Sequence, residues 1–539
     1  MQRRAPPDLP AEEGGAPGPR SRLRSRLLLG AAAALFPLVA LEGACRLLGF
    51  GGPPRLYAAE RGRSGTGLRR VATVGGGPAA VTTEFPEARP PGHARLVFIG
   101  ESTATGLPYP PSVAFPARVE AALRRAGLAV DALNASAPGL GIAEIRRRVE
   151  EMAGYGPDLL VVYTGSNEFF PWNLLPGRER RSHPLRSRLR ELLAGLRLFR
   201  LLAPGEPALA GARDYPLEAS EEDRREARAL CRVEFAALIE GCRRAAVPLL
   251  VALPGANLRD AVPKVRRDYP DPEGRISRVQ AGVLERAGGG DLPGALALLD
   301  ETLRDAPDHP VLHFGRGRVL LELGRKGEAR LAFERARDLD ALPARITADI
   351  HAILEEACAR ASVPRLDAQT VLDAADPTGI SGDAVFVDHV HPTAEGHVLL
   401  ARAILGAMAS EPALGARFPA GALREAASRV EGARLTPGEE AGARRTEAVF
   451  LFPRAYAGGP DSGLAARVLG LLREAAPEDP PDEVAALLLG LLEIRTGDAE
   501  VGRRRLRGAL ERGALPRVEP GLLRAIGETP DSIRARAGG

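Results

Sequence analysis

Short apolar runs alternate with amphipathic helical segments from Arg95 onward. The first run, LVFIG (Leu96–Gly100), is predicted to be a buried strand, and a helix follows within SVAFPARVEAALRRAG. The alternation continues with the strands LAVDALNAS, DLLVVYTG and VPLLVALPG, which are separated by the helices IAEIRRRVEEMAGYG and Ser220–Ala245. Because consecutive parallel strands need a long crossover, this order predicts an α/β fold with a parallel sheet and helices on both faces.

The alternation is interrupted once and then resumes. Residues 276–342 are predicted to be helical throughout, and a period of 34 residues relates Ala295 and Leu299 to Ala329 and Phe333. This period favours inserted tetratricopeptide-like repeats over an ordinary helical hairpin. The helix ARITADIHAILEEACARASV, the strand PRLDAQTVL and the helix HPTAEGHVLLARAILGAM then restore the α/β pattern.

The predicted domain organisation follows from this interruption. The α/β domain has a first part at residues 94–275 and a second part at residues 343–410, on either side of the insert. Residues 411–539 are predicted to be a helical, repeat-like C-terminal region, and residues 51–93 a linker with a short hairpin.

The N-terminal segment has the composition of an export signal. Residues 1–26 are basic and rich in Pro and Gly, which predicts disorder. The apolar segment at 27–50 predicts a signal anchor or transmembrane segment, because Glu42 disrupts the cleavage sites that a removed signal would need. The preceding arginines would remain in the cytoplasm, so the rest of the chain is expected on the periplasmic side of the inner membrane. A cleaved signal and a buried amphipathic helix are the alternatives.

Composition argues against several classes of function. The net charge is +4 over 539 residues, and basic and acidic residues are interspersed, so no nucleic-acid partner is expected. The four cysteines form no CxxC pair, which leaves a zinc or redox motif unsupported and predicts buried free thiols. No cofactor and no metal are expected.

Polar residues follow three of the predicted strands and precede the last helix. They are Gly100-Glu101-Ser102, the loop NASAPGLG at 134–141, Gly165-Ser166-Asn167-Glu168, and the loop FVDHVHP at 386–392. Because ligands bind beyond the carboxyl ends of parallel strands, these loops are expected to meet at one edge of the sheet. Together they supply a nucleophile, backbone donors, a base and an acid, which is the set that acyl transfer requires.

The catalytic roles of the serine, histidine and aspartate follow from their acid–base chemistry. Ser102 is the predicted nucleophile and His391 the general base that removes its proton. Asp388, three residues before the histidine, is predicted to bind the other ring nitrogen and orient the imidazole. If Ser102 were considered alone, a serine in a turn would be the better interpretation. The presence of His391 and Asn167 in the other predicted loops favours catalysis.

An oxyanion hole is predicted from three donors. They are the backbone N–H groups of Ser102 and Gly139 and the side-chain amide of Asn167. Gly141 is the alternative to Gly139, which is favoured by its spacing from Asn134.

The four blocks, in this order, resemble the SGNH or GDSL-type hydrolases. The usual G-D-S is Gly100-Glu101-Ser102 here, and the second block is Asn134-Ala135-Ser136-Ala137-Pro138-Gly139, with Gly139 at the oxyanion position. The usual G-x-N-D is Gly165-Ser166-Asn167-Glu168, and D-x-x-H is Asp388-His389-Val390-His391. The resemblance covers residues 94–260 and 345–410. It implies a flavodoxin-like fold and ester hydrolysis or acyl transfer without a metal. The first and third blocks, the anchor and the inserted repeats are similar to a membrane-anchored subgroup of the family.

Four further residues are candidates for substrate binding. Glu101 and Glu168 replace the usual Asp of their blocks and are also expected to hold their loops. Trp172 follows the third block and predicts a pocket wall, with a mobile lid as the alternative. Arg259 follows the fourth strand and would bind an anionic group or form a structural ion pair.

These observations predict a serine esterase that acts through an acyl-enzyme on an ester-bearing small molecule, envelope glycan or lipid. An O-acyltransferase that uses the same triad on an envelope polysaccharide is one alternative. A second alternative is a non-catalytic scaffold that binds through its repeats. A protein partner of the repeats is a further prediction.

Overall fold

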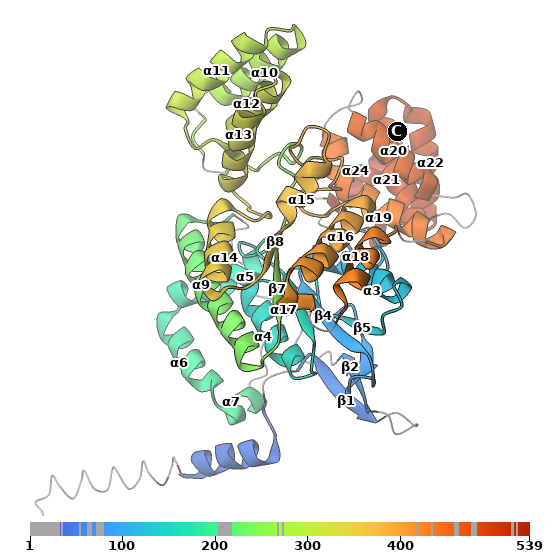
Figure 1. The fold of residues 1–539 in the computed structure, drawn as a ribbon. Coiled ribbons are helices and arrows are strands. Elements are labelled where there is room, and N and C mark those ends of the chain that lie inside the picture. Colours follow the sequence, from blue (N-terminus) through green and yellow to red (C-terminus); the bar gives the residue numbers. More distant parts are fainter. Residues whose placement is uncertain are drawn as a thin grey trace, which may run out of the picture. The chain divides into compact units, whose positions relative to one another are not determined.

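The computed structural model describes most of the chain (Figure 1). The described residues are 33, 36–52, 55–61, 67–71, 80–202, 218–266, 269–271, 274–415, 418–432, 435–457, 463–475, 482–518, 522–523 and 526–538. The predicted basic N-terminus and the start of the predicted anchor lie outside them. The chain divides into a smaller unit, residues 1–54 with 179–206, and a larger unit, residues 55–178 with 207–539.

The larger unit is built on a five-stranded parallel sheet. Its strands lie in the order β5-β4-β6-β7-β8, so the second strand along the chain is at one edge and the first lies beside it. This 2-1-3-4-5 order is that of flavodoxin-like folds. The strands are β4 (Ala94–Gly100), β5 (Val130–Asn134), β6 (Leu159–Tyr163), β7 (Leu249–Leu253) and β8 (Arg365–Asp367).

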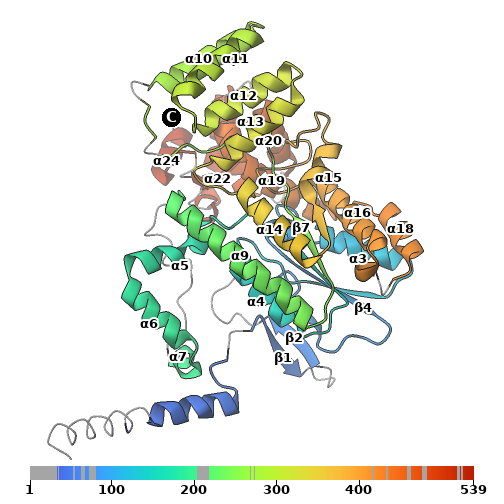
Figure 2. The same ribbon diagram turned by 60° about the vertical axis from the view of Figure 1, so that its left-hand side comes forward.

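Helices cover both faces of this sheet (Figures 1 and 2). Alternate residues of a strand point to opposite faces, so Val97 and Ile99 pack with one helical layer and Leu96 and Phe98 with the other. The first layer contains α4 (Ile142–Ala153), α9 (Glu221–Arg244) and α14 (Ala348–Ala361). The second contains α3 (Phe115–Arg125), α15 (Ala368–Ala375), α16 (Ala394–Ser410) and α18 (Ala420–Ser428), and α17 (Pro412–Gly415) connects the last two. The predicted α/β fold is confirmed.

The predicted strand PRLDAQTVL is wrong in its second half. The strand ends at Asp367, whose carboxylate accepts a hydrogen bond from the backbone N–H of Gln369 and so caps α15. A capping carboxylate at this position favours the start of a helix over a continued strand.

The segment predicted as a linker at 51–93 contains more structure than a hairpin. It forms the antiparallel sheet β1 (Tyr57–Arg61), β2 (Gly67–Val71) and β3 (Glu84–Pro86). Tyr57 is fully buried and its ring meets Phe85 edge-on, with the centroids 4.8 Å apart. The Glu151 carboxylate of α4 accepts the backbone N–H of Tyr57. This small sheet is therefore packed against the larger unit's core.

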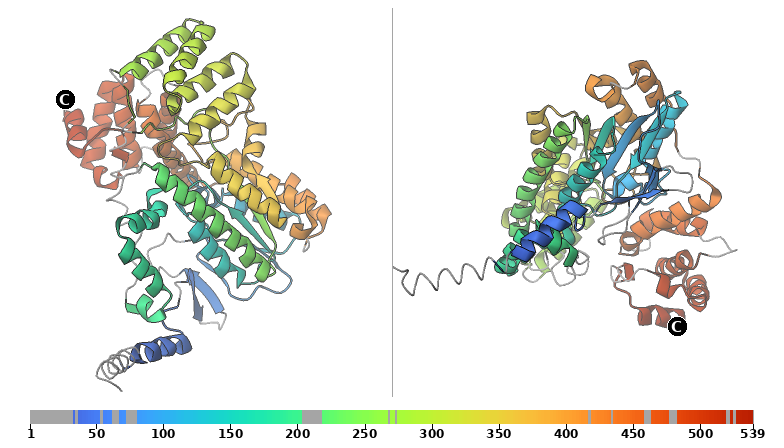
Figure 3. Two further views of the ribbon diagram at one scale, coloured as in Figure 1. Left: turned by 90° about the vertical axis from the view of Figure 1, so that its left-hand side faces the viewer. Right: turned by 90° about the horizontal axis from the view of Figure 1, so that it is seen from below.

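The predicted helical character of residues 276–342 is confirmed. The insert consists of α10 (Arg275–Gly288), α11 (Leu292–Asp305), α12 (Pro310–Glu322) and α13 (Lys326–Asp338), which lie as adjacent hairpins (Figure 3). A Cβ on Gly317 would lie 2.7 Å from the Phe333 ring, so the glycine allows α12 and α13 to approach. The assignment of these hairpins to tetratricopeptide repeats stays a prediction.

The C-terminal region is helical, as predicted, and has a core of its own. Leu451, Phe452 and Leu488 belong to this core. The elements are α19 (Pro437–Ala457), α20 (Gly463–Ala475), α21 (Glu483–Thr496), α22 (Ala499–Glu511), η3 (Leu515–Arg517) and α24 (Pro530–Gly538). Val387, from the predicted catalytic loop, is buried within the same core. The C-terminal region is therefore packed against the loop that carries Asp388 and His391.

The smaller unit contains short helices. Residues 36–48 are helical, α6 spans Pro184–Ala194 and α7 spans Arg197–Leu202, while α5 (Pro171–Ser182) runs from the larger unit into it. Within the described ranges, no helix combines the length and the apolar character that crossing a bilayer requires. All four cysteines are buried free thiols, as predicted.

Candidate active site

Ser102 is the first residue of the short helix α2 (Ser102–Thr105), directly after β4. A Cβ on Gly100 would lie 2.8 Å from the Tyr163 carbonyl oxygen and from the Ala104 Cβ, so this tight strand-to-helix turn requires glycine. The turn holds Ser102, which is half-buried, at the carboxyl edge of the sheet. This is the position at which a parallel sheet places its chemistry.

The structure brings Ser102, His391 and Asp388 together across 289 residues of chain. The Ser102 Oγ lies 2.8 Å from His391 Nε2, and His391 Nδ1 lies 2.7 Å from an Asp388 carboxylate oxygen. The other Asp388 oxygen accepts the backbone N–H groups of Val390 and His391, each at 2.8 Å. Four contacts thus fix the carboxylate and the ring in one orientation.

The charge of Asp388 determines which ring nitrogen of His391 carries the hydrogen. Burial alone would raise the pKa of this carboxyl, but His391 and His389 and the hydrogen bonds from His391 outweigh burial and hold the pKa well below its usual range. The ionised carboxylate accepts the Nδ1–H of His391, which leaves Nε2 as the acceptor for the Ser102 hydroxyl. The arrangement can therefore remove a proton from the serine.

The predicted oxyanion donors lie on loops that are bonded to one another. Gly139 has a φ of +74°, which only glycine adopts readily. Asn167 donates one amide hydrogen to the Leu140 carbonyl at 3.1 Å, which leaves its second amide hydrogen for a ligand. Within the described chain, the backbone N–H groups of Ser102 and Gly139 make no hydrogen bond. The predicted choice of Gly139 over Gly141 stays a prediction.

Glu101 lies inside the protein and braces two of these loops. Its carboxylate accepts the backbone N–H groups of Gly165 and Ser166, at 2.7 and 3.1 Å, and so ties the nucleophile turn to the loop of Asn167. Burial raises the pKa of Glu101 to about 7, although these hydrogen bonds act in the opposite direction. The side chain is 2% exposed, which favours its predicted role in holding the loops over its predicted role in substrate binding.

Glu168 has a similar position one loop further on. One carboxylate oxygen accepts the backbone N–H of Ile142 at the start of α4, and the other has no hydrogen-bond partner among the described residues. Burial, and secondly the charge of Glu101, raise the pKa of Glu168 to about 8. Glu168 is 5% exposed, which favours its predicted role in holding the loop over its predicted contact with substrate.

Trp172 supports the Gly139 loop. Its indole N–H donates to the Gly139 carbonyl at 2.8 Å, and its ring stacks on Phe170 with the centroids 4.8 Å apart. A Cβ on Gly139 would lie 2.9 Å from the indole, so the glycine also allows this close approach. The ring is half-buried, and its predicted role as a pocket wall stays a prediction.

Arg259 is placed as a structural ion pair, the second of its predicted roles. Its guanidinium pairs with Asp376 at 2.6 Å and with Asp260 at 2.9 Å, and it also donates to the Thr378 hydroxyl. These contacts occupy all of the side-chain nitrogens. The predicted contact with an anionic substrate group therefore has no support in the structure.

Asn257, which the sequence did not single out, positions the catalytic loop. Its buried amide donates to the Asp388 carbonyl at 2.9 Å, and its backbone N–H donates to the His389 carbonyl at 3.0 Å. An asparagine in the loop that follows β7 is the signal that would have identified it, because strand ends carry the site's loops.

The C-terminal region also contributes an aromatic side chain beside the catalytic base, which the sequence did not predict. The Phe450 ring of α19 meets the His391 ring edge-on, with the centroids 5.2 Å apart. One turn earlier on α19, Glu447 accepts the Tyr109 hydroxyl at 3.2 Å and pairs with Arg467. Tyr109 follows the nucleophile turn. Helix α19 therefore contacts both the base and the segment that follows Ser102.

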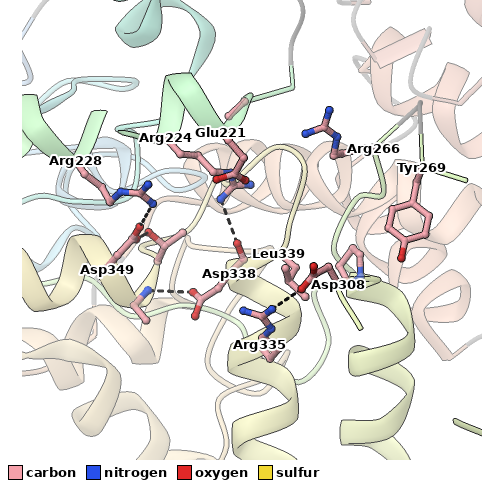
Figure 4. A pocket seen from close by; sticks show the side chains of 14 residues that line it. Glu221, Arg224, Arg228, Arg266, Tyr269, Asp308, Arg335, Asp338, Leu339 and Asp349 are labelled. Carbon is pink, nitrogen blue, oxygen red and sulfur yellow. Dashed lines mark hydrogen bonds and ion pairs between the residues drawn. The ribbon is translucent and has the colours of Figure 1, made fainter. Parts of the chain in front are cut away.

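A cavity of about 600 Å³ lies at a different place, between the insert and helices α9 and α14 (Figure 4). Its charged side chains are largely paired with one another: Arg335 with Asp308, and Arg228 with Asp349. None of the predicted catalytic residues lines it. The chemistry of Ser102 is therefore separate from this cavity.

Comparison with known proteins finds similarity among solved structures alone. No family model matches the chain, and no curated protein matches its sequence. TesA is 12% identical and covers 59% of this chain and 99% of its own, with a TM-score of 0.26. Two further solved structures are similar, each 11% identical with a TM-score of 0.26. A lipolytic protein of the G-D-S-L family from Veillonella parvula covers 58% of this chain and 97% of its own. An extracellular lipase from Streptomyces rimosus covers 59% of this chain and 99% of its own. Likeness at this level carries no argument about activity, which has to come from this chain's own residues.

Proposed function

We propose that this protein is a serine ester hydrolase of the SGNH type. The observation that supports the proposal is the continuous hydrogen-bonded chain from Ser102 through His391 to Asp388, with contacts of 2.8 and 2.7 Å. A serine hydroxyl becomes a useful nucleophile when a positioned base removes its proton, and an imidazole becomes a useful base when a carboxylate fixes its tautomer.

The proposed reaction has two steps. The Ser102 oxygen attacks the ester carbonyl while its proton passes to His391 Nε2, and the negative charge on the carbonyl oxygen is stabilised by the donors of Ser102, Gly139 and Asn167. Each such donor contributes about 3 kcal/mol to the transition state. The intermediate collapses, and the alcohol leaves with the proton held by His391. Water then attacks the acyl-enzyme by the same route and releases the free acid.

A panel of esters tests the proposal. Wild type should hydrolyse members of the panel, and Ser102→Ala and His391→Ala should each lose activity by a factor on the order of 10³ or more. A fluorophosphonate probe should label wild type but not Ser102→Ala. Ser112→Ala is the matched control, because Ser112 is an exposed serine of the same region and should be labelled as wild type is. Equal labelling of wild type and Ser102→Ala would contradict the proposal and favour a non-catalytic scaffold.

The proposed substrates are ester-bearing envelope glycans or lipids, reached from the periplasmic side of the inner membrane. This proposal follows from the predicted signal anchor at 27–50. The products distinguish hydrolysis from transfer: incubation with an acyl donor and an envelope polysaccharide should release free acid. Acylated polysaccharide would instead identify an O-acyltransferase that uses the same triad.

A further inference from the structure

Exposed apolar side chains are concentrated in the smaller unit. Of the eighteen large apolar side chains that are exposed in the described residues, thirteen lie within 36–50 and 185–202. Single exposed leucines are normal on a soluble protein, but a cluster of them marks a surface that binds something. This cluster is remote in sequence from every catalytic residue.

Helix α6 carries a leucine stripe, which we define as Leu185, Leu189 and Leu192. Positions i, i+4 and i+7 lie on one face of a helix. In a globular protein such a stripe faces the core, but here the three side chains are 81%, 58% and 77% exposed. The apolar face of α6 is therefore not covered by the other described residues of the smaller unit.

Exposed arginines border the leucine stripe on both sides. Arg186 follows Leu185 and Arg188 precedes Leu189, and at 100° per residue they lie on opposite flanks of the stripe. A long arginine side chain can lie along an apolar surface while its guanidinium reaches anionic headgroups. This arrangement fits a bilayer surface that carries negative lipids better than it fits an apolar protein face.

The helix at 36–48, which is part of the predicted anchor segment, is held next to α6 and α7. The Glu42 carboxylate accepts the backbone N–H of Leu198 at 2.9 Å, and Arg46 donates to the Gly195 carbonyl at 3.2 Å, so this helix is bonded to the corner between α6 and α7. It exposes Phe36, Val39, Leu47 and Leu48. The helix at 36–48 and α7 lie close together in Figures 1 and 2.

We propose that α6 forms a membrane-docking surface that lies on an anionic lipid bilayer, beside the predicted anchor segment at 27–50. Eleven residues of helix reach about 16 Å, and a bilayer core is about 30 Å thick, so α6 would lie in the interface and not span it. The proposal goes beyond the predicted anchor, because it assigns membrane contact to residues 184–194. It does not depend on the proposed hydrolase activity.

A probe at a single site tests this proposal in the full chain. Leu189→Cys is labelled with a nitrobenzoxadiazole fluorophore, and the protein is incorporated into vesicles of phosphatidylglycerol and phosphatidylcholine. The four native cysteines are buried, so the introduced thiol takes the label. We expect the emission to shift to the blue and to be quenched by lipids that carry a nitroxide near the headgroup.

Leu284→Cys on α10 is the matched control, because Leu284 is 73% exposed and belongs to the insert. Its label should neither shift nor be quenched. Adding Leu185→Ser and Leu192→Ser to the Leu189→Cys chain should abolish the quenching, as should vesicles of phosphatidylcholine alone. An unchanged Leu189→Cys signal in vesicle-bound protein would overturn the proposal. So would a blue shift that needs no lipid and grows with protein concentration, since a second copy would then cover the stripe.

Discussion

The carboxylate of Asp388 controls the chemistry of two other side chains. It holds the Nδ1–H of His391 at 2.7 Å, and the ring in turn presents Nε2 to Ser102. Its second oxygen accepts two backbone N–H groups of its own loop. One side chain therefore sets both the shape of the loop and the tautomer of the base.

Asp388→Asn should separate these two roles. The amide oxygen can keep the backbone contacts, but a neutral amide no longer stabilises the imidazolium that forms when His391 takes the proton. We expect kcat to fall by a factor on the order of 10⁴, with the thermal unfolding temperature little changed. His389→Gln is the comparison: it removes one of the groups that lower the pKa of Asp388 but keeps the carboxylate and His391, so it should lower kcat far less than Asp388→Asn does. A comparable loss in both variants would contradict the assignment of His391 as the base.

Glu168→Gln tests the buried carboxyl behind the oxyanion loop. The folded pKa of Glu168, about 8, lies above the ordinary value of 4.5, so the folded protein keeps this proton where the unfolded chain has lost it. Its contribution to stability is therefore present at low pH and lost as pH rises through the folded pKa. The variant should lose less stability than wild type between about pH 5 and pH 9, by an amount on the order of a few kcal/mol.

Thermal unfolding of both proteins across this pH range provides the measurement. The exposed Glu395→Gln on α16 is the control and should follow the wild-type curve. Parallel curves for wild type and Glu168→Gln would show that Glu168 is already ionised in the folded protein.

Helix α19 contributes a wall to the site from outside the predicted hydrolase domain. The Phe450 ring lies against His391, and Glu447, one turn away, accepts the Tyr109 hydroxyl. The Phe450 ring is half-buried. An apolar wall beside the base limits the size of the group that can approach Ser102.

Phe450→Ala should therefore change substrate preference more than it changes catalysis. We expect the ratio of kcat/KM for a long-chain ester to that for an acetate ester to rise roughly tenfold, because removing the ring opens space beside His391. Val449→Ala, the neighbouring position of the same helix, should leave the ratio unchanged. An equal effect on every ester would indicate that Phe450 supports His391 and does not select substrates.

Local patterns could be predicted from the sequence, and long-range contacts could not. The strands that precede Ser102 and Asn167 were identified because apolar runs ending at glycine mark buried strands. Ser102 and His391 were paired because both belong to motifs at the edge of one sheet. The contact of Phe450 with His391 was not predicted, because the local sequence of α19 does not determine which loop the helix packs against. Glu101 and Glu168 were recognised as loop residues, but their burial depends on the packing of whole helices.

The extent of the main core leads to the last prediction, which concerns truncation. The predicted α/β domain ends at residue 410, but α18 continues the core, with Leu423 and Ala426 fully buried beside α3 and α16. A chain that ends at residue 410 would expose this side of α16 to water, and burying a leucine contributes about 2 kcal/mol. A chain that ends at residue 432 keeps α18 and loses the helices from α19 onward. We expect the longer form to unfold cooperatively with a native-like circular dichroism spectrum, and the shorter form to aggregate or melt at a much lower temperature.

The longer form should nevertheless be a poor esterase, because it lacks Phe450 and uncovers Val387 next to Asp388. Equal melting temperatures for the two forms would mean that α18 adds nothing to the core, and full activity in the longer form would mean that α19 does not contribute to the site.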